Sequence, residues 1–196
     1  MDLACRCGEC GFDEKQRERL QHFSHETLQS IIADLACSHS QTSVLLRNKW
    51  LTEPRDIVMT VSSEYDKRTR EALDFRKEKE ADAWQRDLYY AVLAPLENIP
   101  DEHLSQAEKF IIRLFEDEER LWDITGIGEV WIWSSALHDI WFHVVLKKAR
   151  GNPDVLRESI NLIRNARVFY SLFKTDFRID FIKDQSVRNV FMEFIS

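Results

Sequence analysis

The sequence predicts an all-α protein, a single-domain bundle of about seven to nine helices, on three observations. Glycine and proline are scarce, with 5 and 4 residues in a chain of 196, so there is little material for the tight turns of a β-protein. Apolar residues recur every three to four positions, which is the period of a helix face, and no segment shows the alternation of a strand. Hydrophobic residues make up 44% of the chain, with 6 Trp and 12 Phe, which is ample for one core.

The segment 129–151 gives the strongest helix signal. From Trp133 the apolar residues follow at positions i+4, i+7, i+8, i+11 and i+12, which form one helical face. Ser134 and Ser135 near its start and Gly151 after its basic last turn are typical of helix ends. We expect this helix to lie at the centre of the bundle. The residues expected in the core or at a dimer interface are Tyr65, Phe75, Trp131, Trp133 and Trp141.

The remaining chain divides into a short first segment and the helical domain. Residues 1–12 carry three cysteines and two glycines and are expected to be irregular, whereas residues 13–196 form the bundle. Ser24 is a good N-cap for a helix with Leu28 on its apolar face, and Pro95 is expected to kink or end another. The other helices are expected within residues 13–21, 24–40, 41–49, 52–80, 82–97, 104–122, 155–173 and 176–195.

Charge and composition limit the cellular compartments and the kinds of partner that are expected for the chain. The net charge of −7 repels phosphate backbones, so nucleic-acid binding is disfavoured unless a local basic face overrides it. No apolar run approaches the roughly 20 residues of a membrane span, and the first residues do not resemble a secretory signal. Four unevenly spaced cysteines do not resemble a disulfide framework. We therefore expect an intracellular protein without a transmembrane segment.

The cysteines of the first segment are the only candidates for a metal site. Cys5, Cys7 and Cys10 could bind zinc as thiolates, with a fourth ligand from Cys37, His22, His25 or His39. Their spacing lacks the paired C-x2-C elements of a typical structural zinc site, and the alternative is an irregular tail. We expect no cofactor, with zinc as the alternative.

No motif identifies a reaction, so we do not expect an enzyme. His138 and His143 lie five apart, which on a helix separates their rings by about 140°, whereas zinc hydrolases need a spacing of four. The carboxylates of residues 116–119 lack a matching base, nucleophile or metal set and are expected to be a solvated face. Gly126-x-Gly128 is too short for a dinucleotide-binding loop.

One flank of the helix after Pro153 is the most basic part of the chain. Such a patch suits an acidic partner, a phospholipid head group or a phosphate, and paired with the surplus carboxylates it would be ordinary surface. The candidate partner-binding residues are Arg157, Arg164, Arg167 and Lys174.

Several segments, in order, resemble the Cut8/Sts1 family of nuclear proteasome tethering factors. The family's helical domain opens with a pattern like S-x3-L-x2-(I/L)(I/L)-x2-L-x3-H-P, where Ser40 here replaces the proline, and the resemblance spans residues 20–150. It implies an all-α bundle likened to 14-3-3 proteins, a dimerising N-terminal part and a role in holding proteasomes at the nucleus. The family uses a lysine-rich N-terminal extension, whereas Lys15 is the only lysine here before Lys49. The matching residues are Ser24, Leu28, Ile31, Ile32, Leu35, His39, Asp82, Ala83, Arg86, Leu93, Leu96, Ala136, Ile140, Trp141, Val144 and Val145.

A shorter segment resembles the MADF class of DNA-binding domains. Phe110-Ile111 followed by Leu121-Trp122-Asp123 is similar to the opening helix of that class, and the basic flank after Pro153 would be the reading helix. Two functions are therefore expected as alternatives. One is a nuclear, non-enzymatic adaptor that binds proteins and self-associates, and the other is a helical DNA-binding regulator.

Overall fold

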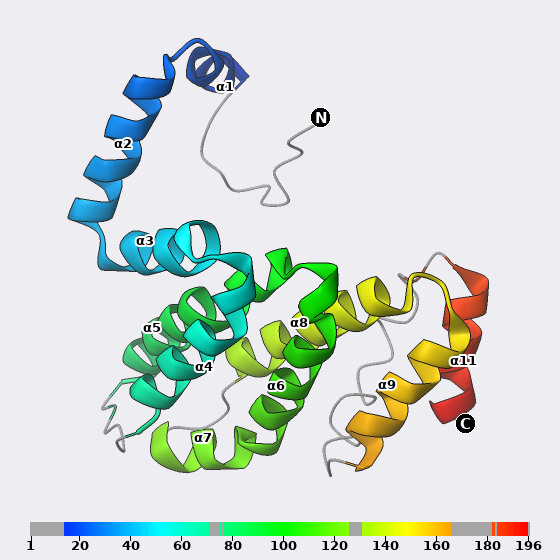
Figure 1. The fold of residues 1–196 in the computed structure, drawn as a ribbon. Helices are drawn as coiled ribbons and strands as arrows, with labels where there is room; N and C mark the ends of the chain where they lie inside the picture. Colours follow the sequence, from blue (N-terminus) through cyan, green and yellow to red (C-terminus); the bar gives the residue numbers. More distant parts are fainter. Residues whose placement is uncertain are drawn as a thin grey trace. The chain divides into compact units, whose positions relative to one another are not determined.

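The computed structural model describes residues 14–70, 75, 77–125, 131–165, 182 and 184–195, and the structural statements below concern this part of the chain. It contains ten α-helices and no strand, which confirms the all-α prediction (Figure 1). The helices are α1 (Glu14–Gln21), α2 (His25–Ser38), α3 (Ser40–Leu45), α4 (Ile57–Arg68), α5 (Glu78–Leu88), α6 (Leu104–Glu116), α7 (Glu118–Thr125), α8 (Trp131–Ala149), α9 (Pro153–Asn165) and α11 (Gln185–Ile195).

The chain forms two compact units, residues 1–43 and 44–196. The sequence predicted a boundary after residue 12, at the end of the cysteine-containing segment, and that segment lies outside the described residues. The later division has a simple physical basis. No described side chain of α1 or α2 is buried, so these helices contribute no buried residue to the core, and Val44, the first residue of the second unit, is the first that packs against it.

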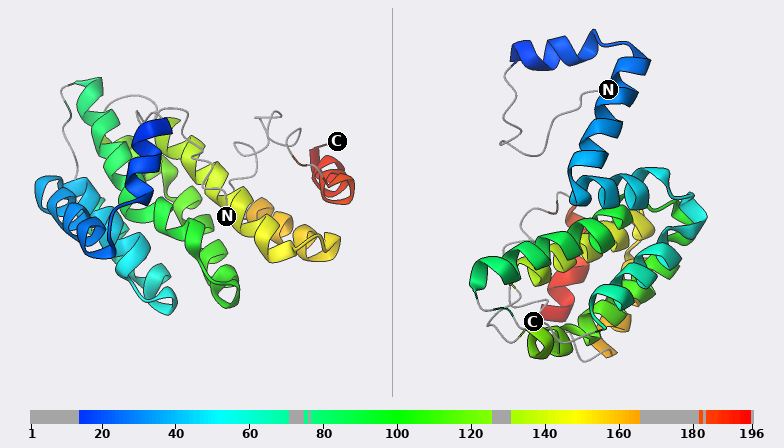
Figure 2. Two further views of the ribbon diagram at one scale, coloured as in Figure 1. Left: turned by 90° about the horizontal axis from the view of Figure 1, so that it is seen from above. Right: turned by 90° about the vertical axis from the view of Figure 1, so that its left-hand side faces the viewer.

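The second unit is built around α8. This helix packs against α5, α6 and α9, and α9 in turn packs against α11 (Figure 2). Trp133 and Trp141 of α8 are completely buried, as the sequence predicted for the central helix. Trp133 stacks on Tyr65 of α4 with ring centroids 6.0 Å apart, and Trp141 meets Phe191 of α11 edge-on at 6.3 Å. Aromatic contacts therefore join α8 to the helices on both sides of it.

The first turn of α8 is tied to α5. The described part of the helix begins at Trp131, and Ser134 and Ser135 lie near its start, as the sequence predicted. The backbone N–H of Trp133 donates to the side-chain oxygen of Gln85 at 3.1 Å, and Gln85 is a buried residue of α5. A neighbouring helix therefore satisfies this first-turn N–H. The end of α8 agrees with the sequence, with Gly151 at a φ of 80°. Asn152 then accepts a hydrogen bond from the backbone N–H of Asp154 at the start of α9.

The long charged segment 52–80 does not form one helix. It contains α4, which ends at Arg68, and the first residues of α5, which begins at Glu78. At the end of α4, the hydroxyl and the backbone N–H of Thr69 both donate to the Tyr65 carbonyl. The Thr69 carbonyl accepts a hydrogen bond from Arg120 at 2.8 Å. The tertiary contact with α7 thus fixes the end of α4.

The predicted helix 82–97 changes form before its proline. α5 ends at Leu88, a π-helical segment spans Tyr89–Leu93, and a 3-10 segment spans Ala94–Asn98, with Pro95 at its start. A second π-helical segment, Leu46–Leu51, carries the buried Asn48, whose amide donates to the Ala91 carbonyl at 2.9 Å. This bond ties the two segments together and gives a buried polar side chain its partner.

A buried ion pair lies where α6, α8 and α9 meet. Glu108 of α6 is 1% exposed, and its Oε2 lies 2.6 Å from the ammonium of Lys148 on α8. Lys148 also lies 3.4 Å from the hydroxyl of the buried Ser159 on α9. Because removing one member of a buried pair leaves the other charge unpaired, this contact ties the three helices in one arrangement.

No helix in the described part of the chain is long and apolar enough to cross a lipid bilayer.

The tryptophan contacts predict a large difference between two substitutions. Trp133→Ala should lower the free energy of unfolding by about 3–5 kcal/mol, because it empties a fully buried site against Tyr65. Trp50→Ala, at a side chain that is 62% exposed, should change it by less than about 0.5 kcal/mol. Urea unfolding followed by circular dichroism measures both. Equal effects of the two substitutions would contradict the placement of Trp133 in the core.

Candidate functional site

The helix α2 has well-formed ends of its own. Ser24, predicted as its N-cap, accepts a hydrogen bond from the backbone N–H of Thr27 at 3.1 Å. At the other end, the backbone N–H of His39 donates to the Leu35 carbonyl at 3.0 Å. Capping at both ends satisfies backbone groups that would otherwise need external partners. The helix is therefore locally well defined although it contributes nothing to a core.

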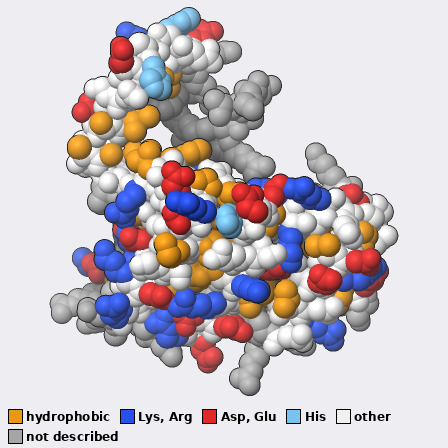
Figure 3. Space-filling model, viewed as in Figure 1, with side chains coloured by type: hydrophobic (Ala, Val, Ile, Leu, Met, Phe, Trp, Pro, Cys, Tyr) orange, Lys and Arg blue, Asp and Glu red, His pale blue; other side chains and the backbone are white. Residues whose placement is uncertain are grey.

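One face of α2 is apolar and uncovered within the described residues. Leu28, Ile31, Ile32 and Leu35 follow the i, i+3, i+4, i+7 spacing that places them on one side of a helix. Ile32 is 47% exposed and Leu35 is 46% exposed, and none of the residues of α2 is buried. Hydrophobic side chains are visible on the surface of the first unit in Figure 3. A two-turn apolar stripe of this kind is normally the face by which a helix packs. We call these four residues the α2 face.

The predicted core or dimer residues are mostly core residues of the second unit. Tyr65, Trp133 and Trp141 are completely buried. Phe75 is half-buried and contacts Trp84 of α5 with ring centroids 5.9 Å apart. Trp131 is the first residue of α8, and its side chain lies outside those described. The three buried rings are consequently inaccessible to a partner chain.

Tyr65 also anchors a polar network between α4 and the start of α7. Its hydroxyl donates to Asp117 at 2.7 Å, and Arg120 donates to the same carboxylate at 2.8 Å. Burial, followed by the contact with Asp117, raises the pKa of Tyr65 above its usual range. The hydrogen bonds from Arg120 and Tyr65 hold the pKa of Asp117 below its usual value. The network fixes the turn between α6 and α7.

The acidic run at residues 116–119 is only partly the solvated face that the sequence predicted. Glu116 and Glu119 are exposed, but Asp117 belongs to the Tyr65 network and Glu118 is half-buried. Burial raises the pKa of Glu118, and a hydrogen bond with Ser134 only partly opposes this rise. The Oε1 atom of Glu118 has no hydrogen-bond partner among the described residues. Neighbouring carboxylates on this turn therefore face different environments.

The basic flank is partly neutralised by carboxylates. The guanidinium of Arg157 lies 3.0 Å from Asp154 and 3.0 Å from Glu193, so it joins α9 to α11. The same hydrogen bonds hold the pKa of Glu193 below its usual range. Arg164 is exposed in the last turn of α9, and Arg167 and Lys174 lie outside the described residues.

The histidines and cysteines do not assemble a metal site in the described part of the chain. His138 is buried against Phe115 with ring centroids 5.3 Å apart, whereas His143 is exposed and lies 3.1 Å from the Glu97 carbonyl. The two rings diverge, as their spacing of five predicted. No group of metal-ligating residues occurs among the residues described, and Cys5, Cys7 and Cys10 lie outside them.

Sequence analysis missed the buried ion pair of Glu108 and Lys148. Lys148 was interpreted only as a basic residue near a helix end, but it is partly buried and its ammonium pairs with the buried Glu108. A signal for Glu108 was present, because it falls in the apolar stripe of α6 four positions after Leu104 and three before Ile111. A charged residue in such a stripe indicates a buried partner.

Comparison with known proteins does not place the chain in a family. No family model matches it, and neither a curated protein nor a solved structure is significantly similar to it. The resemblance to the Cut8/Sts1 family therefore stays a prediction.

The lowered pKa of Asp117 predicts a pH-dependent effect of Asp117→Asn. The variant should lose about 1–2 kcal/mol of unfolding free energy at neutral pH, since it replaces a carboxylate that accepts two hydrogen bonds. Because the pKa of Asp117 is lower in the folded state than its ordinary value of 3.8, the ionised carboxylate stabilises the fold above pH 3.8. This stabilisation is lost as the pH falls through the folded-state pKa of Asp117. Denaturant unfolding over a pH series should show the two proteins converging in acid. A difference that grows in acid would contradict this assignment.

Glu118→Gln should change the unfolding free energy in the opposite direction to Asp117→Asn. Because the pKa of Glu118 is higher in the folded state than its ordinary value of 4.5, the carboxylate begins to destabilise the fold as the pH rises above 4.5. The full destabilisation is reached above the folded-state pKa of Glu118. The neutral amide removes this cost, so the variant should gain about 1 kcal/mol at neutral pH and little at acid pH. Thermal unfolding measures the change, with the exposed Glu119→Gln as a control that should change nothing. Loss of stability in Glu118→Gln at neutral pH would contradict the prediction.

Proposed function

We propose that this chain is a non-enzymatic adaptor that binds another protein through the α2 face. The observation that supports the proposal is a capped helix of 14 residues that buries none of its side chains among the described residues. Helices of this length are marginal in water and gain most of their stability by packing an apolar face. A partner that accepts the α2 face in an apolar groove would supply that packing, as in other helix-in-groove complexes.

The exposure of the α2 face determines how much binding affinity its burial by a partner is expected to contribute. Ile32 and Leu35 each leave nearly half of the side chain uncovered. Covering the rest of each would contribute about 1 kcal/mol, since full burial of such a side chain is worth roughly 1.5–3 kcal/mol. The two residues together then account for roughly a thirtyfold change in affinity.

The Cut8-like resemblance adds two specific partners to this proposal. One is the proteasome, held at the nucleus, and the other is a second copy of the chain. The α2 face supports either, because Leu28, Ile31, Ile32 and Leu35 are among the residues that carry the resemblance.

DNA binding is the less supported alternative. Arg157, the first residue of the basic flank, already pairs with two carboxylates, so less positive potential remains for a phosphate backbone. The net charge of −7 acts in the same direction.

The α2 face can be tested with charge-matched variants. Ile32→Glu with Leu35→Glu should abolish retention of the partner, whereas Ser30→Glu with Ala33→Glu, on the opposite side of α2, should retain it. Tagged full-length protein is incubated with nuclear extract, and proteasome subunits are quantified in the eluate with and without nuclease. Sedimentation of the same variants measures self-association.

Each result has a definite meaning for the proposal. Proteasome subunits that survive nuclease and disappear only in the Ile32→Glu, Leu35→Glu variant would support tethering. Equal retention by both variants would refute the role of the α2 face. Chromatin proteins that nuclease releases would favour the DNA-binding alternative instead.

A further inference from the structure

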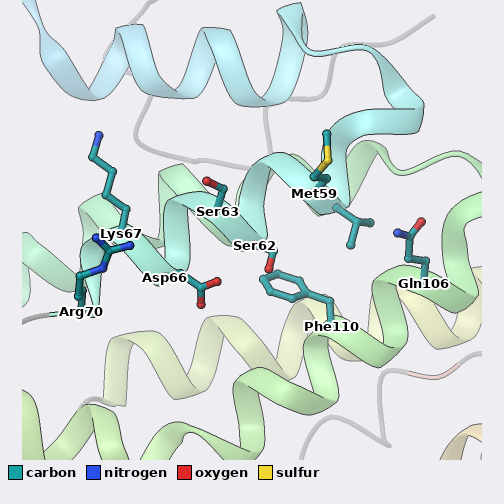
Figure 4. A pocket seen from close by; sticks show the side chains of 9 residues that line it. Met59, Ser62, Ser63, Asp66, Lys67, Arg70, Gln106 and Phe110 are labelled. Atoms are coloured by element: carbon teal, nitrogen blue, oxygen red, sulfur yellow. The ribbon is translucent and has the colours of Figure 1, made fainter.

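A groove of about 840 Å³ lies on the second unit between α4 and α6 (Figure 4). One wall follows α4 from Val58 to Arg70, just beyond its end, and the other is formed by Gln106 and Phe110 of α6. At about 1.5 Å per residue, the stretch from Met59 to Arg70 is roughly 16 Å long, or three helical turns. The groove is thus long enough for a short peptide segment.

The two ends of the groove differ in character. Met59 is 66% exposed at one end, on the side where Figure 4 also shows Gln106, and the nearly buried side chains of Val58 and Phe110, each 6% exposed, also line the groove. Lys67 and Arg70 are exposed at the other end, and neither forms an ion pair with a described residue. Figure 4 shows these two cations on the side of the groove away from Met59. An apolar end and a basic end are therefore separated along one surface.

The middle of the groove holds a polar bridge. Arg113 of α6 pairs with Asp66 and lies 3.2 Å from the hydroxyl of Ser62, so it joins the two walls. With Asp66 neutralised by Arg113, the charges that remain among the described lining residues are those of Lys67 and Arg70, a sum of +2 in a chain of net charge −7. A local positive potential in an acidic protein selects a partner with carboxylates at this position.

We propose that this groove docks an acidic peptide segment of a partner protein. The segment places one large apolar side chain over Met59 and Phe110 and carboxylates on Lys67 and Arg70. The apolar end distinguishes a peptide from a nucleic acid, which would need a longer row of cations along its phosphates. The groove and the α2 face share no residue, so this proposal stands apart from the proposed function and would give the adaptor a second docking site.

Peptide selection tests the groove without knowledge of the natural partner. Full-length protein is used to select from a displayed library of random peptides of about 12 residues, which span the groove as a helix. Enriched sequences should combine a large apolar residue with at least two carboxylates. The affinity of one enriched peptide, labelled with a fluorophore, is then measured by anisotropy on each variant.

Three variants locate the binding site. Lys67→Glu with Arg70→Glu should weaken the peptide at least tenfold, about 1.4 kcal/mol, whereas Lys79→Glu with Arg86→Glu, an equal charge change on α5, should not. Met59→Ser should weaken binding less, and without changing its salt dependence. A peptide with its carboxylates changed to lysine should regain binding to the Lys67→Glu, Arg70→Glu variant. All the substituted side chains are exposed, and circular dichroism checks that each variant is folded.

Several outcomes would overturn the proposal. They are the absence of enriched acidic peptides, equal weakening by the two charge-reversal pairs, or groove-dependent binding of a labelled DNA duplex in place of a peptide. Loss of the peptide in Ile32→Glu with Leu35→Glu, but not in the groove variant, would assign the peptide to the α2 face. That result would reject the groove and leave the proposed function standing.

Discussion

The arrangement of the second unit depends on the burial of α8. Its buried side chains form a broad sector that includes Trp133, Leu137, Trp141 and Val145, wider than the stripe of a helix that packs on one side only. A helix of this kind needs neighbours in several directions, and α5, α6 and α9 supply them. The other helices of the unit can then be understood as the cover that α8 requires.

Polar contacts determine which arrangement of helices around α8 is adopted. Apolar packing is non-directional, so it would permit several ways of surrounding α8. Glu108 and Lys148 can pair in only one arrangement of α6 and α8. The hydrogen bond that the backbone N–H of Trp133 donates to Gln85 restricts the position of α5 in the same way. Tyr65 and Asp117 set the turn between α6 and α7 in the same way. These bonds restrict how the helices pack, because breaking one would leave a buried polar group without its partner.

The surfaces proposed for binding are formed largely by exposed side chains. The α2 face belongs to a helix that contributes nothing to the core, and the groove between α4 and α6 joins an exposed methionine to two cations without ion pairs among the described residues. Apolar side chains exposed together at helical spacing are an unfavourable use of surface unless a partner covers them. These features are the basis of the proposal that the chain is an adaptor with two docking surfaces.

The sequence by itself determined the fold class, the central helix and its aromatic core, and the capped helix that follows Ser24. These features depend on local periodicity and capping, which are properties of neighbouring residues. Only the tertiary structure decided which side chains satisfy the end of α4 and the first turn of α8 and which charge is buried, because Arg120, Gln85 and Glu108 contact residues far away in the chain. The groove between α4 and α6 was also invisible in the sequence. Its apolar end and its basic end become one surface only when two helices about 50 residues apart lie side by side, as the hydrogen bond from Arg113 to Ser62 shows.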